Sequence, residues 1–170
     1  MTEQGYGKRR TPHAARNLLR AALVLAIGTA LGCTARSRNM EKTWPVLRVV
    51  DGDTLRVLYA PPAPLPESVR LLNVDAPERG KPGYEEAAEA LRRMVEGRRV
   101  RLEFEHAGRV ERDGFGRLLA YVLVDEVNVN VEMVRQGWGR FFDRCGEGRY
   151  AETFRAAENE AREGRRGNWR

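Results

Sequence analysis

The sequence predicts an α+β fold that is mainly β, built as a five-stranded barrel with about three helices. Short runs of β-branched and aromatic residues recur along the chain with turn signals between them, and helical stripes appear only between and after these runs. The 170 residues are 42% hydrophobic and 32% charged. This composition is typical of one globular domain and excludes a disordered chain or a membrane bundle.

Two turn signals separate the first three strands. Asp51 and Gly52 lie between two β-rich runs, which is a strong hairpin signal. A proline cluster at residues 61–66 predicts a loop before the third run. The five strands are expected at residues 46–50, 55–59, 69–74, 100–104 and 118–124.

Three helices follow from apolar spacing and from capping residues. Apolar residues recur at helical spacing from Tyr84 to Val95, and a second stripe runs from Tyr150 to Ala161. Between them, residues 131–136 form a short helix with Asn130 as the expected N-cap. Five short, mostly sequential strands with helices inserted between and after them favour the OB-fold barrel.

The N-terminal segment has the pattern of an export signal. Residues 1–32 carry a net charge of +4 and end in an uncharged run of about 12 residues, whereas a membrane span needs about 20. The ending A-L-G-C at Cys33 resembles a bacterial lipoprotein signal with Cys33 as the lipidated mature N-terminus. Ordinary signal-peptidase cleavage nearby is the alternative. Residues 33–43 then form a polar tether, and the domain occupies residues 44–170.

Charge and residue usage exclude several classes of site. The 138 residues after the leader carry only +2 of the total +6, which argues against a broad cationic surface for nucleic acid. The chain has two cysteines, Cys33 and Cys145, and no Cys-x-x-Cys motif. After the leader, His106 is the only histidine. Zinc sites, Ser–His triads and histidine acid catalysis therefore lose support.

Three short motifs carry charged residues in a pattern that suits phosphate chemistry. They are V-V-D-G-D-T-L at 49–55, V-R-L-L-N-V-D-A-P-E at 69–78 and E-R-D-G-F-G-R-L-L-A-Y at 111–121. Each alone has a structural explanation, such as a turn or a surface arginine. Together they offer three carboxylates without histidine or cysteine, a donor set for calcium or magnesium. Two arginines beside such a set can bind phosphate oxygens in pairs.

In order and spacing, these motifs resemble those of the staphylococcal nuclease (thermonuclease) family. The resemblance extends through V-N-V-E-M-V-R-Q-G-W at 129–138 to the final G-N-W. It implies the five-stranded barrel with three helices. It also implies that Asp53, Asp75 and the main-chain carbonyl of Ala76 bind Ca²⁺, and that Glu78 contacts the metal through water and serves as the proposed general base.

The resemblance further implies that Arg70 and Arg117 hold the scissile phosphate, and that the reaction is hydrolysis of DNA or RNA phosphodiester bonds by water, leaving 3′-phosphates. Some positions depart from the family. Phe115 stands where relatives often have tyrosine, and Phe141 and Phe142 stand where base-pocket tyrosines are expected. Trp138 and Trp169 are interpreted as packing residues.

The leading hypothesis is thus an exported, monomeric, calcium-dependent nuclease acting on DNA or RNA. It would be an envelope lipoprotein held to the membrane only through Cys33, or a secreted or periplasmic protein. The alternatives are a catalytically degenerate module that binds nucleic acid or protein, and a lipoprotein whose barrel binds another anionic ligand. Retention of all five charged site residues favours the enzyme.

Export can be checked on protein produced in a bacterial host. We expect mass spectrometry to find an N-terminus near Cys33. If that residue is acylated, Cys33→Ala releases the protein from the membrane fraction; if secretion is simple, the change has no effect on fractionation. A cytoplasmic protein that still begins at Met1 contradicts both versions.

Overall fold

The computed structural model describes residues 42–60, 62–143 and 146–170. The predicted leader, Cys33, Cys145 and most of the predicted tether lie outside these residues. The first strand begins at Thr43, one residue before the predicted start of the domain. Within the described ranges, no helix is both long and apolar enough to cross a membrane.

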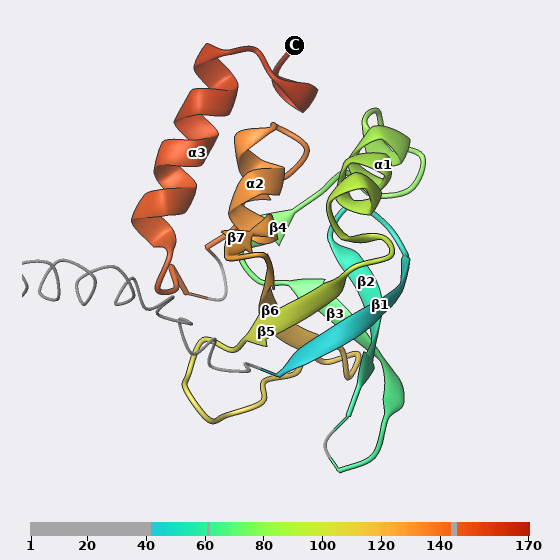
Figure 1. The fold of residues 1–170 in the computed structure, drawn as a ribbon. Coiled ribbons are helices and arrows are strands. Elements are labelled where there is room, and N and C mark those ends of the chain that lie inside the picture. Colours follow the sequence, from blue (N-terminus) through green and yellow to red (C-terminus); the bar gives the residue numbers. More distant parts are fainter. Residues whose placement is uncertain (1–41, 61, 144–145) are drawn as a thin grey trace, which may run out of the picture. The chain divides into compact units, whose positions relative to one another are not determined.

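Five strands close into the predicted barrel (Figure 1). Antiparallel pairing gives the order β3-β2-β1-β5-β6, and a parallel pairing of β3 with β6 closes the ring. This is the OB-type barrel that the strand pattern predicted. The strands are β1 (Thr43–Val49), β2 (Thr54–Tyr59), β3 (Leu65–Leu71), β5 (Arg99–Glu103) and β6 (Leu118–Val124).

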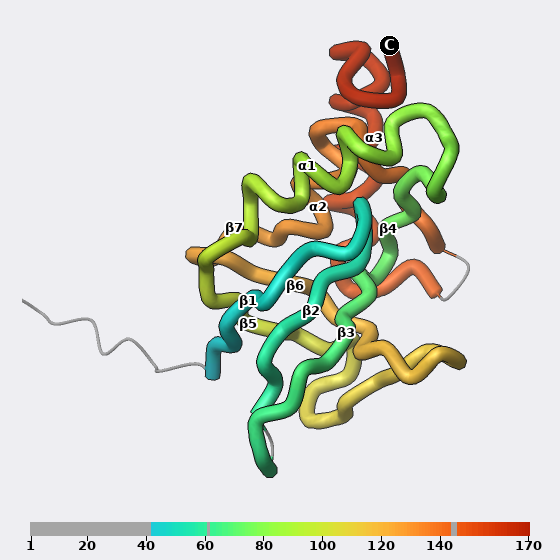
Figure 2. Tube along the Cα trace, turned by 90° about the vertical axis from the view of Figure 1, so that its right-hand side faces the viewer, coloured from blue at the N-terminus to red at the C-terminus, as the bar shows by residue number. Residues whose placement is uncertain are grey.

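The helices gather beside the barrel, as Figures 1 and 2 both show. The helix α2 packs against β6 and α3, while α1 packs against β1 and α2. Three two-residue strands complete the fold, and of these β4 pairs with β8 and β7 with β6. The bounds are β4 (Val74–Asp75), α1 (Tyr84–Val95), β7 (Val127–Asn128), α2 (Val129–Arg135), β8 (Arg140–Phe141), α3 (Ala151–Glu163) and η1 (Gly167–Trp169).

The apolar residues of the predicted strands and helical stripes form one core. Leu55, Val69 and Leu118 from three barrel strands are fully buried, as are Leu91 of α1 and Phe154 of α3. Burial of such side chains is the main favourable term in folding, at roughly 1.5–3 kcal/mol for each. The core therefore joins the barrel to the helices and holds fixed the strand ends that carry the charged motifs.

The third strand differs from the prediction of residues 69–74. The strand begins at Leu65, inside the proline cluster. Its first residues pair only with β2, so this part of β3 is an edge strand, and an edge strand tolerates proline. It ends at Leu71, because Asn73 takes the left-handed conformation with φ of 60°. The buried Asn73 side chain donates to the carbonyls of Phe142 and Gly146, both at 2.9 Å. These bonds hold the turn that starts β4.

The N-cap of α2 also differs from the prediction. The helix begins at Val129, and the side chain of Asn128, not Asn130, accepts a hydrogen bond from the Val131 N–H. Asn130 is instead fully buried. Its Oδ1 accepts from the Val122 N–H at 2.9 Å, and its Nδ2 donates to the carbonyls of Leu72 and Ala120. Asn130 thus joins α2 to β6 and to the turn after β3.

These contacts predict unequal effects of truncating the two asparagines. Asn130→Ala leaves buried main-chain groups without partners, each at about 1–3 kcal/mol, so we expect a loss of about 3 kcal/mol in unfolding free energy. Asn128→Ala removes the single side-chain hydrogen bond that caps α2 and should cost about 1 kcal/mol. Urea unfolding of both variants measures the difference. An Asn128 effect as large as that of Asn130 contradicts this account.

Candidate active site

The hairpin turn between β1 and β2 places Asp53 at the base of α1. Gly52 packs so closely there that a Cβ atom would lie 2.7 Å from the Ala87 Cβ and 2.8 Å from the Ala76 Cβ. Only glycine permits this approach. The Asp53 carboxylate is thereby buried, and its Oδ2 accepts a hydrogen bond from the Ala76 N–H at 3.0 Å. Its Oδ1 accepts from the Thr54 hydroxyl at 3.1 Å.

One arginine links the two acidic motifs. Arg70 Nη1 lies 2.8 Å from Asp53 Oδ2, and Arg70 Nη2 lies 3.9 Å from Asp75 Oδ1. Arg70 also donates to the Val74 carbonyl at 2.7 Å, which fixes its guanidinium beside β4. Because the turn at Asn73 redirects the chain after β3, Asp75 returns to the side chain of Arg70 five residues earlier. Three predicted site residues therefore lie together.

Burial and neighbouring charge act in opposite directions on Asp53. Burial raises the pKa of its carboxyl, while Arg70 and the Ala76 N–H lower it, and the result is a pKa of about 6. The aspartate is costly to ionise in this position despite its arginine partner. A buried carboxylate of this kind favours additional positive charge nearby.

A braced turn presents the second predicted arginine, Arg117, at the start of β6. Asp113 Oδ1 accepts from the N–H groups of Phe115 and Arg117, and its Oδ2 accepts from Arg117 Nε at 2.7 Å. Burial acts to raise the pKa of Asp113, but the hydrogen bonds from Arg117 and the turn N–H groups lower it overall. Arg117 Nη1 also reaches the Thr54 hydroxyl at 3.5 Å. Asp113 thus stays ionised and orients Arg117.

Arg70 and Arg117 line one pocket of about 250 Å³. Phe115 and Phe142 line it as well, and Phe115 is 88% exposed. Phe141 faces the other way, where its ring stacks on Phe154 at a centroid distance of 5.2 Å. Of the two phenylalanines considered for a base pocket, only Phe142 lies beside the arginines. The pocket combines paired guanidinium groups with aromatic surface, which suits a nucleotide phosphate and base.

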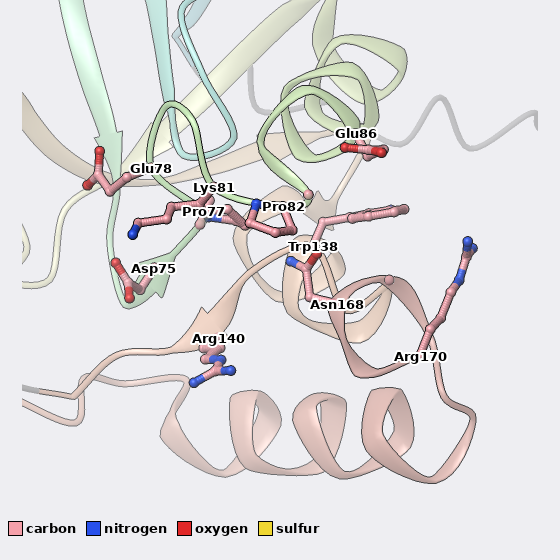
Figure 3. A pocket seen from close by; sticks show the side chains of 13 residues that line it. Asp75, Pro77, Glu78, Lys81, Pro82, Glu86, Trp138, Arg140, Asn168 and Arg170 are labelled. Atoms are coloured by element: carbon pink, nitrogen blue, oxygen red, sulfur yellow. The ribbon is translucent and has the colours of Figure 1, made fainter.

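Ala76 and Glu78 lie on the other side of Asp75. They line a second pocket, of about 620 Å³, together with Asp75 itself (Figure 3). Glu78 is exposed there. The described residues contain no group of three or more His, Cys, Asp or Glu side chains placed to hold a metal ion. Of the predicted acidic residues, Asp53 and Asp75 contact Arg70. Glu78 does not join these contacts but lines the same pocket as Asp75.

The donor chemistry of this cluster fits a hard divalent cation. Asp53 and Asp75 supply carboxylate oxygens within reach of one guanidinium, and the Ala76 main chain adjoins them. Oxygen donors without sulfur or imidazole are the ligands of calcium and magnesium. The raised pKa of Asp53 supports the same conclusion, since a cation would relieve the cost of its buried charge.

Two positioning residues were missing from the set of site residues predicted from the sequence. Asn73 controls where Asp75 lies, and Asp113 orients Arg117. Asp113 has a recognisable signal, because aspartate commonly begins a turn and accepts hydrogen bonds from the N–H groups that follow. Asn73 has only a weak one, because asparagine tolerates positive φ but is common elsewhere.

A small barrel whose edge carries acidic residues and two arginines defines an OB-fold domain with a charged site at the barrel edge. The family model described as "Staphylococcal nuclease homologue" matches residues 68–170. The chain belongs to this family.

Curated proteins agree with this assignment. The chain is 34% identical over 145 residues to "Endonuclease YncB" of Bacillus subtilis, an alignment covering 80% of this chain and 66% of that protein. It is 33% identical to the prophage-derived endonuclease YokF of the same organism, over 72% of this chain and 42% of that protein. It is 30% identical to "Thermonuclease" of Staphylococcus hyicus, over 78% of this chain and 79% of that protein. The chain spans less than two thirds of the length of the two Bacillus proteins.

The pKa of Asp53 predicts how the metal-free protein responds to pH. A carboxyl whose pKa is higher in the folded state stabilises the fold when protonated, and this contribution is lost as pH rises from about 4 to about 6. Asp53→Asn removes this dependence. In chelator, the Asp53→Asn variant should therefore be more stable relative to wild type at pH 7.5 than at pH 4. The difference in unfolding free energy, variant minus wild type, is more positive at the higher pH.

Denaturant unfolding at the two pH values measures this difference. Asp125→Asn is the matched control, because the Asp125 side chain is 91% exposed, and its effect should change little with pH. A difference between Asp53→Asn and wild type that is the same at both pH values contradicts the buried-charge account.

Proposed function

We propose that this chain is a calcium-dependent nuclease that hydrolyses phosphodiester bonds of DNA or RNA by attack of water. The observation that carries the proposal is the contact of Arg70 with both Asp53 and Asp75, in a position where Arg70 and Arg117 also line one pocket. Family membership supports nuclease chemistry. We assign this nuclease chemistry to individual residues of this chain.

We infer that the two arginines act as a phosphate clamp. Arg70 is held by β3 and by the Val74 carbonyl, and Arg117 is held by Asp113, so both guanidinium groups are oriented before substrate arrives. Each planar group can donate two hydrogen bonds to phosphate oxygens. Charge develops on these oxygens during hydrolysis, and preorganised donors stabilise it without reorganisation.

The acidic residues provide the remaining functions. We assign Asp53, Asp75 and the Ala76 carbonyl to cation binding and Glu78 to accepting the proton of the attacking water. Glu78 is suited to this because it is exposed at the pocket beside Asp75. A bound Ca²⁺ would supply Lewis-acid stabilisation of the phosphate. Members of this family are metal-dependent, and the oxygen-only donors favour calcium.

We further propose that the protein is exported. The basic and then apolar pattern of residues 1–32 supports a cleaved leader, and A-L-G-C supports lipidation at Cys33. Both features lie outside the described residues. An exported enzyme would meet the millimolar calcium concentrations that extracellular sites use.

The direct test is hydrolysis of single-stranded DNA and RNA with calcium and with excess chelator. We expect cleavage that requires millimolar-range calcium and is poor with magnesium, which demands tighter octahedral geometry. Full activity in chelator rules out the metal assignment. Binding of nucleic acid without turnover at any calcium concentration favours the degenerate-module alternative.

Replacing either clamp arginine by lysine keeps the charge but removes paired donation. An arginine directed at a transferring phosphoryl group is worth on the order of 10³–10⁵ in rate in other systems. We therefore expect Arg70→Lys and Arg117→Lys each to reduce kcat by about 10³ or more. Steady-state kinetics on single-stranded DNA measures this, with thermal melting to confirm the fold.

Arg93→Lys provides the control, because Arg93 is exposed on α1. It should change kcat by less than about threefold, as is usual for surface substitutions. Near-wild-type turnover in both clamp variants would exclude the clamp role.

A further inference from the structure

The 620 Å³ pocket lies beside the proposed catalytic cluster but is not used by it beyond Asp75, Ala76 and Glu78. Its volume falls within the range of ligand pockets, roughly 300–1,000 Å³. Figure 3 shows Asp75 and Glu78 at one end of the pocket and Arg170 at the other, with Trp138 between them. The pocket therefore extends away from the site along the surface of the domain.

Three cations line this pocket without an acidic partner. In the part of the chain that the structure describes, Lys81, Arg140 and Arg170 form no ion pair, whereas most described arginines do. Arg140 pairs in register with Asp75 across β4 and β8, yet the two side chains form no salt bridge. Cations left unpaired around a concave surface favour an anionic ligand.

The acidic residues of the pocket define where such a ligand would lie. Asp75 and Glu78 belong to the proposed catalytic end, and Glu86 is the remaining acid, so three acids and three bases line the pocket. The bases near the catalytic end are Lys81, whose side chain extends toward Asp75 in Figure 3, and Arg140. A chain of phosphates leaving the clamp would meet these two cations first and Arg170 later.

Arg70 and Asp75 separate this pocket from the smaller one. Arg70 lines the 250 Å³ pocket, Asp75 lines the 620 Å³ pocket, and the two side chains are 3.9 Å apart. A phosphate held at this boundary would have one neighbouring nucleotide on each side. An enzyme that cuts within a strand must accommodate both.

We propose that the 620 Å³ pocket is a second subsite, which binds the backbone phosphates of single-stranded nucleic acid on the side of the scissile bond opposite to the arginine-lined pocket. This inference rests on the proposed nuclease function. Lys81, Arg140 and Arg170 bind the phosphates. Trp138 packs against the core, as predicted, but its indole is only half-buried. The exposed part of the indole, with the Arg170 guanidinium 5.9 Å from its ring centroid, provides a face on which a base can stack.

The test compares single-stranded oligothymidylates of two and eight nucleotides. The triple variant Lys81→Gln, Arg140→Gln and Arg170→Gln should bind fluorescein-labelled octanucleotide at least tenfold more weakly in chelator. Each lost phosphate contact lowers the slope of log affinity against log salt by about 0.7, so the slope should fall by about 2. With calcium, the loss in kcat/KM should be greater for the octanucleotide than for the dinucleotide.

Two further variants separate a subsite from a general charge effect. Lys42→Gln, Arg48→Gln and Arg93→Gln remove the same charge from exposed positions outside the pocket. They should leave the affinity within about twofold of wild type and the salt slope unchanged. The charge-conserving variant Lys81→Arg, Arg140→Lys and Arg170→Lys should keep most of the affinity. Melting temperatures confirm that all variants fold.

The outcomes distinguish the subsite from the function on which it rests. If wild type cleaves but the pocket variant and the charge-matched control behave alike in affinity and salt slope, the subsite is excluded and the nuclease proposal stands. If neither wild type nor any variant cleaves, the nuclease proposal fails, and the salt slope of octanucleotide binding decides whether the pocket binds nucleic acid.

Discussion

The parallel pairing of β3 with β6 is the interaction on which the site depends. It closes the barrel, and its register sets Arg70 opposite Leu119. Arg117 precedes Leu119 by two residues, so both arginines come to the same edge although 46 residues of sequence separate them. Since β2 pairs Thr54 with Arg70 on the other side, Asp53 is delivered to the same place. A shift in the pairing of β3 with β6 would therefore move Arg117 away from Arg70 and its acidic neighbours.

The barrel could be predicted because its strands and long helices have strong periodic patterns. Residues 118–124 and the stripe of α1 match the structure at both ends. The turn after β3 could not be predicted, because it depends on a non-glycine residue at positive φ whose amide bonds to main-chain groups 69 and 73 residues away. Two-residue strands such as β4 have too few residues to form a pattern.

Similar limits apply to the helix cap and the site. Asn128 and Asn130 are both good cap residues by type, and only tertiary contacts assign one to the cap and the other to the core. Two of the motifs carry Asp53, Arg70 and Asp75, and the structure brings these three residues into contact. Which of Phe141 and Phe142 faces the arginines depends on the direction of β8, and the sequence alone left this open.

Asn130 has a consequence for how mutational maps of this domain would be read. Its amide donates to the carbonyl of Leu72, the residue before the turn that carries the chain to Asp75. Loss of this contact alters the support of an acidic site residue from inside α2, without touching any ligand. In a saturation screen scored by activity, positions 73 and 130 would rank with the site residues. Parallel scoring of protein abundance would assign them instead to the framework that holds the site.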